Sequence, residues 1–348
     1  MKIGVAMSGG VDSSVAACLL LEQKHDVTGF TMRHFDNEAG GFAPDDGVEA
    51  AIRDAGDVCR QLGIEHHVID VRQDFERIVI ADFIAEYERG HTPNPCCLCN
   101  STIKFGVFLD AILAHGMAAM ATGHYSRLEQ HGDLVRLFRG DVVQRDQSYM
   151  LWGLTQAILR HTLFPISGDK SAVRAIARRH NLTIAHKSGS QDICFVRDNY
   201  KRFLLKHTEP LPGDIRFKDG RRIGRHNGIQ FYTLGQRRGL GIPWNRPLFV
   251  MSIDPVAHTL TVTDDLADLA RNRFRLRRTN WICGNMPDGG GLAVQVRYNS
   301  PPVPVAALAE TEDGFEVELL RPEQAVTPGQ SAVFFRDNEL LGGGVIQS

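Results

Sequence analysis

The 348-residue sequence predicts an α/β protein that begins with a Rossmann-like, mainly parallel sheet and ends in a β-barrel. Through the first 204 residues, short apolar runs alternate with segments of helical periodicity, which favours parallel strands joined by helices. Glycine and proline then become frequent and helical periodicity fades, which indicates a small central domain at 205–272. From residue 273 to 348, short alternating runs are separated by turn signals, a pattern typical of a barrel or sandwich.

The elements of the first domain follow one another in a regular order. Strands are expected at 3–6, 27–32, 65–71 and 117–122, and helices at 15–21, 48–62 and 171–180. Gly63 stands where a helix C-cap belongs, and polar loops are expected at 36–47 and 187–192. Ligands on parallel sheets bind at the carboxyl ends of the strands, so Met32 and Gly123 are expected to share a pocket with the loop after the first strand.

That loop, MSGGVDSS at residues 7–14, carries the clearest functional signal. Gly9 and Gly10 permit a sharp turn and close approach of a ligand. Ser8, Ser13 and the free N–H groups at the start of the following helix then face one small volume, where the helix dipole favours phosphate. The Gly-Lys-Ser/Thr of the Walker loop does not follow the glycines, so this is a different phosphate loop. A plain glycine turn is the alternative, and it is a less specific explanation of the whole motif.

Composition sets broad limits on function. The formal net charge is −2, which argues against coating nucleic acid by bulk charge and leaves local basic patches, such as Arg237 with Arg238 and the run 271–278. No apolar run is expected to span a membrane and the first residues lack signal-peptide architecture. We therefore expect a cytoplasmic protein with no membrane partner.

Three of the seven cysteines, Cys96, Cys97 and Cys99, crowd into what reads as one loop stiffened by prolines. A disulfide scaffold is not expected in such a chain. The sequence leaves two interpretations open. Either the CxxC formed by Cys96 and Cys99 binds zinc or an iron–sulphur cluster, although no second CxxC completes the ligand set, or cysteines act covalently together with Cys194. The others are expected to be structural: Cys18, Cys59 and Cys283.

Eight motifs, in order, resemble the bacterial tRNA-specific 2-thiouridylases, a family within the PP-loop ATP pyrophosphatases. They are AMSGGVDSS, TPNPCCLCNSTIKF, ATGHY, RDQSYML, SQDICF, GIQFYTLGQRRGLGI, VRYNSPP, and TPGQSAVFF with LGGG. The resemblance covers almost the whole chain and implies an ATP-pyrophosphatase domain, a small central domain and a C-terminal β-barrel. It also implies a reaction. With ATP and Mg²⁺, the enzyme adenylates the C2 oxygen of the wobble uridine (position 34) of tRNA and then transfers sulphur from a cysteine persulphide, giving 2-thiouridine, AMP and pyrophosphate.

The resemblance also implies roles for individual residues. It places the persulphide on Cys194 and makes Cys99 the nucleophile that releases sulphide or forms a disulphide with Cys194. Nucleotide contacts fall on Ala6, Met7, Ser8, Gly9, Gly10, Val11, Asp12, Ser13, Met32 and Gly123. Contacts with tRNA fall on Asn94, Pro95, Cys96, His124, Arg145, Asp146, Gln147, Arg297, Tyr298 and Gln330. The implied partners are the anticodon loop of tRNA and a sulphur relay protein or cysteine desulfurase that donates the persulphide.

The sequence departs from the family pattern at one position. Some members carry aspartate where Cys96 stands, so the source of general acid or base catalysis stays open. An iron–sulphur cluster held by Cys96, Cys99 and Cys194 is a hypothesis without further support, and no metal site is predicted. The alternative functions are another PP-loop ATP pyrophosphatase that adenylates a small molecule, a thiolase acting at a different tRNA position, and a metal-binding tRNA module without catalysis.

Overall fold

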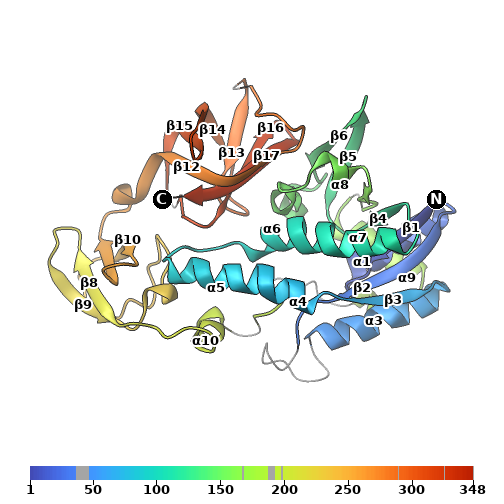
Figure 1. Cartoon of the computed structure of the whole chain (residues 1–348), viewed down its shortest axis with the longest axis horizontal. Helices are drawn as coiled ribbons and strands as arrows, with labels where there is room; N and C mark the ends of the chain where they lie inside the picture. Colours follow the sequence, from blue (N-terminus) through green and yellow to red (C-terminus); the bar gives the residue numbers. More distant parts are fainter. Residues whose placement is uncertain are drawn as a thin grey trace.

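A computed structural model describes residues 1–36, 47–166, 168–186, 193–196, 199–288, 290–324 and 326–347. The chain forms three parts: a parallel sheet flanked by helices, a small sheet built from the middle of the chain, and a barrel (Figure 1). The barrel, orange to red in Figure 1, lies over the long helical stretch that contains α6 and α7. Residues 37–46 of the loop predicted at 36–47, and the loop predicted at 187–192, lie outside the described residues.

The first part contains a five-stranded parallel sheet in the order β3-β2-β1-β4-β7. The four predicted strands are confirmed, and the short β7 extends the sheet beyond β4. The strands are β1 (Lys2–Ala6), β2 (Asp26–Arg33), β3 (His66–Asp70), β4 (Ala119–Ala121) and β7 (Thr162–Leu163). Buried side chains such as Ile3 and Val5 pack this sheet against its helices.

The predicted helices are also present and flank this sheet. They are α1 (Val11–Glu22), α3 (Gly47–Leu62) and α9 (Lys170–Arg179), and Gly63 ends α3 with a left-handed φ of +68°. The remaining α-helices are α4 (Arg72–Phe75), α5 (Ala81–Glu88), α6 (Pro95–Cys99), α7 (Phe108–Ala114), α8 (Gln156–Leu159) and α10 (Tyr200–Leu205). Two π-helical segments, η1 (Glu76–Ile80) and η2 (Asn100–Val107), join α4 to α5 and α6 to α7. Short 3₁₀ turns complete the list: η3 (Val143–Arg145), η4 (Ser148–Leu151), η5 (Thr183–His186), η6 (Ile229–Phe231) and η7 (Leu266–Leu269).

The middle of the chain folds into a four-stranded sheet in the order β10-β11-β8-β9. Its strands are β8 (Gly213–Phe217), β9 (Arg222–His226), β10 (Phe249–Asp254) and β11 (Thr259–Thr263). Ile215, Val250 and Leu260 are fully buried in its own small core. This agrees with the strand-rich and turn-rich texture expected from the sequence.

The C-terminal part is a closed barrel of six antiparallel strands, which the resemblance implied and which is one of the two folds, barrel or sandwich, that the alternating pattern allowed. The strands are β12 (Ala270–Trp281), β13 (Leu292–Gln295), β14 (Val303–Thr311), β15 (Gly314–Gln324), β16 (Ser331–Arg336) and β17 (Glu339–Gln347). The ring closes where β12 pairs with β17. Leu276, Val294 and Phe334 fill its interior.

A hairpin from the N-terminal part extends the barrel sheet, which the sequence did not predict. The hairpin consists of β5 (Ser126–His131) and β6 (Leu134–Arg139), and β6 pairs with β17 through Leu137 and Leu340. Residues before 204 therefore contribute strands to the sheet formed by the C-terminal part.

One helical stretch, Pro95–Ala114, is long and apolar enough to cross a membrane by length and composition alone, a test that core helices also pass. Its Ile103, Phe108 and Ile112 side chains are buried in two of the protein's hydrophobic cores. The apolar character of this stretch is therefore accounted for by packing inside the protein.

Candidate active site

The phosphate loop joins β1 to α1 at the carboxyl end of β1. Gly9 has φ +66°, and a Cβ there would lie 2.5 Å from the carbonyl oxygen of Ala51, so only glycine fits. Gly10 precedes the helix in extended conformation and provides no side-chain cap. The Ser13 hydroxyl accepts a hydrogen bond from the Ser8 N–H at 3.1 Å and folds the loop back on itself. The N–H groups of the first turn of α1 have no partner within the helix, and the phosphate site predicted there stays a prediction.

Several of the predicted nucleotide residues offer backbone rather than side chain. Met7 and Val11 are only 2% and 3% exposed, so their side chains belong to the core. Gly123 lies against the loop, since a Cβ there would come within 2.7 Å of the Ser13 nitrogen. Met32, at the end of β2, is half-buried between two cores. The structure thus brings Gly123 to the loop and places Met32 at the end of the strand that pairs with β1.

Two side chains that the sequence analysis missed hold the loop's Asp12. The hydroxyl of Tyr125 donates to one carboxylate oxygen at 2.7 Å, and Lys170 Nζ donates to the other at 3.2 Å. Tyr125 follows Gly123 in the ATGHY motif, which was a usable signal. Lys170 is 158 residues away from Asp12, and no sequence signal connected the two.

The clustered cysteines lie on a helix, so the interpretation of this segment as a loop was wrong. Asn94 is the N-cap, with its side-chain oxygen accepting from the Cys97 N–H at 3.3 Å, and Pro95 occupies the first helical position. Asparagine is favoured as an N-cap because its side chain bonds to a free backbone N–H, and proline is favoured at the first helical position because its missing N–H is not needed there. Cys96 and Cys99 are half-buried on α6, and Cys97 is buried.

Cys194 lies within electrostatic range of Cys99, Cys96 and Lys104, although it is 95 positions beyond Cys99 in the chain. Cys194 is an exposed residue. The surrounding protein nevertheless desolvates its thiol, which raises the pKa of that thiol. The thiols of Cys99 and Cys96 raise this pKa further. Burial likewise raises the pKa of Cys99 to about 11, with Lys104 acting in the opposite direction. The pKa of Cys96 is also raised, chiefly by burial.

Lys104 connects this cysteine cluster to the phosphate loop. Its Nζ lies 3.4 Å from His124 Nε2, and His124 Nδ1 lies 2.7 Å from the Thr122 hydroxyl. His124 follows Gly123, which packs against the loop. Burial, and then the charge of Lys104, lowers the pKa of His124 well below its usual value, so the imidazole is neutral. Contacts therefore link the phosphate loop to Lys104 through Gly123 and His124, and the charge of Lys104 acts on the three thiols.

Several of the predicted tRNA residues gather beside the cysteine helix. Tyr298, from the barrel, packs on Tyr149 with ring centroids 5.7 Å apart. Burial raises the pKa of Tyr298, and the charges of Asp146 and Cys96 raise it further while Arg145 lowers it. Arg145 is exposed, as is the barrel residue Arg297.

Other predicted tRNA residues have structural partners within the protein. The buried Asp146 accepts hydrogen bonds from Arg139, from the Gly140 N–H and from both the N–H and hydroxyl of Ser148. Gln147 Oε1 accepts from the Tyr125 N–H at 3.1 Å. Gln330 Nε2 donates to the Thr92 carbonyl at 2.7 Å. These hydrogen bonds hold the side chains of Asp146, Gln147 and Gln330 in place within the protein.

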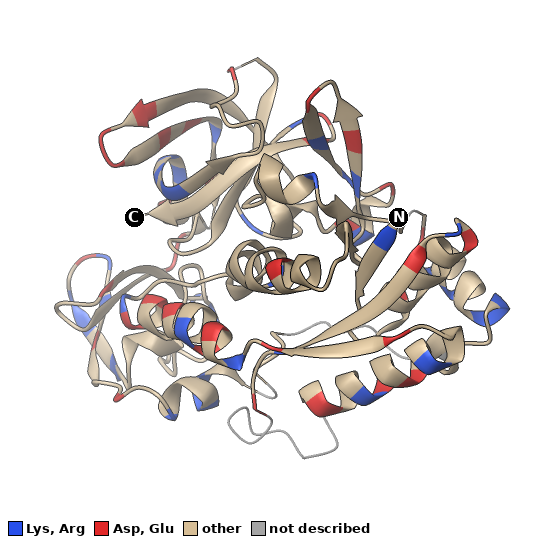
Figure 2. Ribbon diagram, turned by 45° about the vertical axis from the view of Figure 1, so that its right-hand side comes forward, with Lys and Arg blue, Asp and Glu red and all other residues tan. Residues whose placement is uncertain are grey.

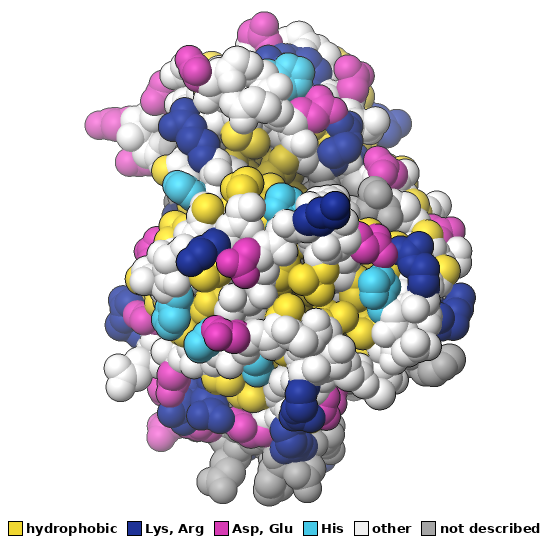
Figure 3. All heavy atoms as spheres, turned by 90° about the vertical axis from the view of Figure 1, so that its right-hand side faces the viewer, with side chains coloured by type: hydrophobic (Ala, Val, Ile, Leu, Met, Phe, Trp, Pro, Cys, Tyr) yellow, Lys and Arg dark blue, Asp and Glu magenta, His cyan; other side chains and the backbone are white. Residues whose placement is uncertain are grey.

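The basic patches that the sequence offers, 271–278 and Arg237 with Arg238, differ in their surroundings. In the run 271–278, Arg273 pairs with Glu318, Arg277 with Glu86 and Arg278 with Asp82. Arg237 and Arg238 are exposed in the central part. Acidic and basic residues alternate along α3 in Figure 2, and in Figure 3 charged side chains of both signs are scattered among hydrophobic ones. Binding of RNA to this surface would therefore depend on contacts with individual side chains rather than on overall positive charge.

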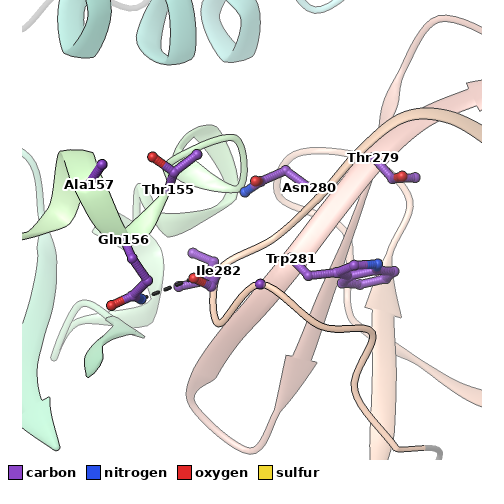
Figure 4. A pocket seen from close by; sticks show the side chains of 8 residues that line it. Thr155, Gln156, Ala157, Thr279, Asn280, Trp281 and Ile282 are labelled. Carbon is purple, nitrogen blue, oxygen red and sulfur yellow. Dashed lines mark hydrogen bonds between the residues drawn. The ribbon is translucent and has the colours of Figure 1, made fainter. Parts of the chain in front are cut away.

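Two cavities lie between the barrel and the helices. The larger, about 440 Å³, is lined mostly by neutral side chains on 155–157 and 279–282, where Gln156 Nε2 donates to the Ile282 carbonyl (Figure 4). None of the predicted site residues lines it. The smaller, about 270 Å³, reaches Asn94 and Cys97 and is bounded on the other side by Arg277 and Arg278.

Metal binding by the cysteines receives no support from the geometry. Among the residues that the structure describes, no group of three or more His, Cys, Asp and Glu side chains is arranged to hold a metal ion. The seven cysteines are all free thiols. The first three residues of the SQDICF motif, 190–192, lie outside the described part of the chain.

The phosphate loop, the parallel sheet and the adjacent thiols define an ATP-using α/β enzyme. A family model described as a tRNA methyl transferase HUP domain matches residues 1–198. Models described as a tRNA methyl transferase PRC-barrel domain and an aminomethyltransferase β-barrel domain match 201–264 and 271–346. The chain belongs to the tRNA-specific 2-thiouridylase family.

The relatives match along the whole chain. A tRNA-specific 2-thiouridylase MnmA from Pelobacter propionicus is 41% identical over 353 positions, covering 99% of this chain and 97% of the relative. The protein of the same name from Chloroflexus aurantiacus is 44% identical, covering 98% and 97%. Among solved structures, a 4-thiouridine synthetase–RNA complex with bound ATP has a TM-score of 0.36 and 17% identity, covering 59% of this chain and 50% of the other.

Proposed function

We propose that this protein is an ATP-dependent tRNA 2-thiouridylase that modifies the wobble uridine, with Cys99 and Cys194 as its sulphur-handling residues. The observation that carries the proposal is the contact of Lys104 with His124, which follows Gly123 at the phosphate loop, together with the action of the Lys104 charge on the thiols of Cys96, Cys99 and Cys194. Activation of a carbonyl oxygen and delivery of sulphur must occur at one uridine, so the two chemistries need adjoining sites.

The first step is adenylation of the base. The C2 oxygen of the uridine attacks the α-phosphorus of ATP, the bond to the β-phosphate oxygen breaks, and pyrophosphate leaves. The N–H groups at the start of α1 stabilise the charge that develops on the phosphates. Phosphate oxygens are ligands that Mg²⁺ prefers, and this ion would offset phosphate charge when bound, whereas both carboxylate oxygens of Asp12 already accept from Tyr125 and Lys170.

The second step is transfer of sulphur. The outer sulphur of a persulphide on Cys194 attacks C2, and AMP departs with the original oxygen. The thiolate of Cys99 then attacks Cys194 Sγ, which forms a disulphide and leaves sulphur on the base as 2-thiouridine. In the alternative order, Cys99 attacks the persulphide first and frees sulphide, which attacks C2. A thiol reductant restores both cysteines before a donor protein supplies the next persulphide.

Recognition of tRNA depends on a base that is turned out of the anticodon loop. The partly buried Asn94, Cys96 and Tyr298 are proposed to contact this base, and the exposed Arg145 and Arg297 are suited to phosphate. We place this activity in the cytoplasm, where tRNA and ATP are available.

Two other functions make different demands on the site. A synthetase that adenylates a small molecule needs the phosphate loop but has no need for Cys99 and Cys194 to be close together. A methyl transferase, the activity in the names of the family models, needs a methyl donor rather than a phosphate loop with thiols beside it. The approach of the two cysteines favours sulphur transfer over both.

The test is nucleoside mass spectrometry of tRNA incubated with the protein, ATP, Mg²⁺ and a persulphide source. We expect sulphur to replace oxygen at the wobble uridine with the wild type, and expect this product to be lost in Cys99→Ser and Cys194→Ser. Cys283→Ser, a half-buried thiol in the barrel, is the matched control and should retain activity. Thiolation that survives both active-site substitutions would refute the assigned roles, and AMP formation with a small acceptor alone would refute the substrate.

A further inference from the structure

The phosphate loop lacks a cation of its own. Residues 6–13 contain no lysine or arginine, and the only charged residue among them is Asp12. Pyrophosphate is a strongly anionic leaving group, and a lysine within the loop performs this task in Walker-type sites. Besides Mg²⁺ and the N–H groups of α1, any positive side chain at the phosphates must therefore come from another part of the chain.

Helix α9 supplies a cation because it lies alongside α1 in the same direction. At their first turns, Lys170 of α9 contacts Asp12 of α1. At their far ends, Arg179 and His180 contact Glu22. Contacts at both ends show that the two N-termini lie together at the phosphate loop, where their dipoles have the same favourable sign for an anion.

The contact at the loop is enclosed. The Lys170 side chain is 15% exposed and the Asp12 side chain 27% exposed. Tyr125, itself 5% exposed, occupies the second carboxylate oxygen of Asp12. A lysine that is already enclosed loses less side-chain freedom when it binds an anion than a surface lysine does. The enclosed Lys170 is therefore suited to binding an anion.

We propose that Lys170 is a phosphate-binding residue, which contacts the pyrophosphate-forming end of ATP and exchanges some or all of its contact with Asp12 for that phosphate. This inference rests on the nucleotide site of the proposed function. Lys170 supplies from α9 the cation that the loop lacks, and Asp12 holds the ammonium group in position before ATP arrives. The competing explanation is that the ion pair only docks α9 against α1.

Lys170→Gln separates these explanations, because glutamine retains a hydrogen-bond donor toward Asp12 but loses the charge. Lys218→Gln is the matched control, since Lys218 pairs with Asp268 at 2.8 Å in the central part of the chain. Binding of ATP and of AMP is measured by calorimetry, with a thermal melt of each variant. We expect Lys170→Gln to bind ATP roughly 10- to 100-fold more weakly, as for loss of a charged hydrogen bond, with AMP binding changed by less than about threefold. Lys170→Arg should restore part of the affinity for ATP.

Each outcome decides the matter. Unchanged ATP affinity in Lys170→Gln overturns the inference and leaves the proposed function intact. Equal weakening of ATP and AMP with a lower melting temperature also overturns it, in favour of a docking role. If wild-type protein binds neither nucleotide, the proposed function fails first. Should Lys170→Gln not fold, ATP and AMP affinities of Lys170→Met and Lys170→Arg are compared instead, and equal ATP affinity in these two overturns the inference.

Discussion

The buried carboxylate of Glu86 is expected to be one of the larger single contributors to stability. It is 2% exposed and lies on α5, facing the barrel. Its oxygens accept hydrogen bonds from Arg89 at 3.0 Å, from His91 at 2.9 Å and from Arg277 at 2.6 Å. Arg277 belongs to β12, so this cluster joins the barrel to the helices that lead to the cysteines.

The magnitude follows from the pKa of Glu86. Burial alone would raise it, but the hydrogen bond from His91 and the charge of Arg277 lower it from 4.5 to about 2. At about 1.4 kcal/mol per unit, this shift corresponds to roughly 3 kcal/mol of stability. Because the folded-state pKa is lowered, that stability is fully present above pH 4.5 and is lost as the pH falls toward 2.

Glu86→Gln is therefore expected to reduce the free energy of unfolding by about 3 kcal/mol at pH 7, since it leaves Arg277 half-buried without its counter-charge. Urea denaturation followed by circular dichroism measures this at pH 7 and again near pH 3, where the difference from wild type should shrink. Glu318→Gln is the control, because it removes an exposed ion pair with Arg273 on the same strand and should cost less than about 1 kcal/mol. A Glu86→Gln variant that is no less stable than the control, or whose deficit does not change with pH, would refute the reasoning.

Three further changes have expected outcomes. Lys104→Met should raise the pKa of Cys99 further. The pH at which iodoacetamide alkylates Cys99 at half its maximal rate should therefore increase. An unchanged pH profile would exclude an electrostatic role of Lys104 at Cys99. Asn94→Ala should cost about 1 kcal/mol as a lost N-cap and slow sulphur transfer while ATP binding is retained, which thiolation and calorimetry assays check together. Gly329→Ala should destabilise the protein by roughly 1–3 kcal/mol, because φ is +89° and the new Cβ would lie 3.0 Å from the backbone of the segment leading to the cysteines. Gly132→Ala, with φ +58° and open space, isolates backbone strain, and equal melting temperatures of the two variants would contradict the steric argument.

The parts that could be predicted from sequence depend on short-range signals. The phosphate loop follows a buried strand and precedes a helix within a few residues, so its position and chemistry are both local. Gly63 marked the end of α3 for the same reason, because a left-handed C-cap requires only the residue at that position. Alternating runs and turn residues predicted the strands of the C-terminal part but left barrel and sandwich open, because closure depends on the long-range pairing of β12 with β17.

The cysteine helix shows a local signal that was present and was weighed wrongly. Pro95 suggested a stiff loop, but Asn94 before it and the small apolar residues after it are the pattern of a capped helix start. The pairing of β6 with β17 joins residues about two hundred positions apart, and short-range patterns do not specify such a partner. The contact of Lys170 with Asp12 could not be predicted for the same reason, because it depends on how α1 and α9 pack together rather than on the sequence of either helix alone.

Burial of the thiols explains why the site needs a substrate before it can react. With a pKa of about 11, Cys99 is thiolate in roughly one molecule in ten thousand at pH 7, whereas an ordinary thiol is thiolate in a few per cent. Lys104 lowers the pKa of Cys99, Cys96 and Cys194, yet burial outweighs it at all three. Burial therefore keeps the Cys99 thiol protonated and unreactive. Sulphur transfer must then be coupled to an event that removes a proton from Cys99, and the binding of tRNA next to Cys96 and Tyr298 is the event that the proposed site provides.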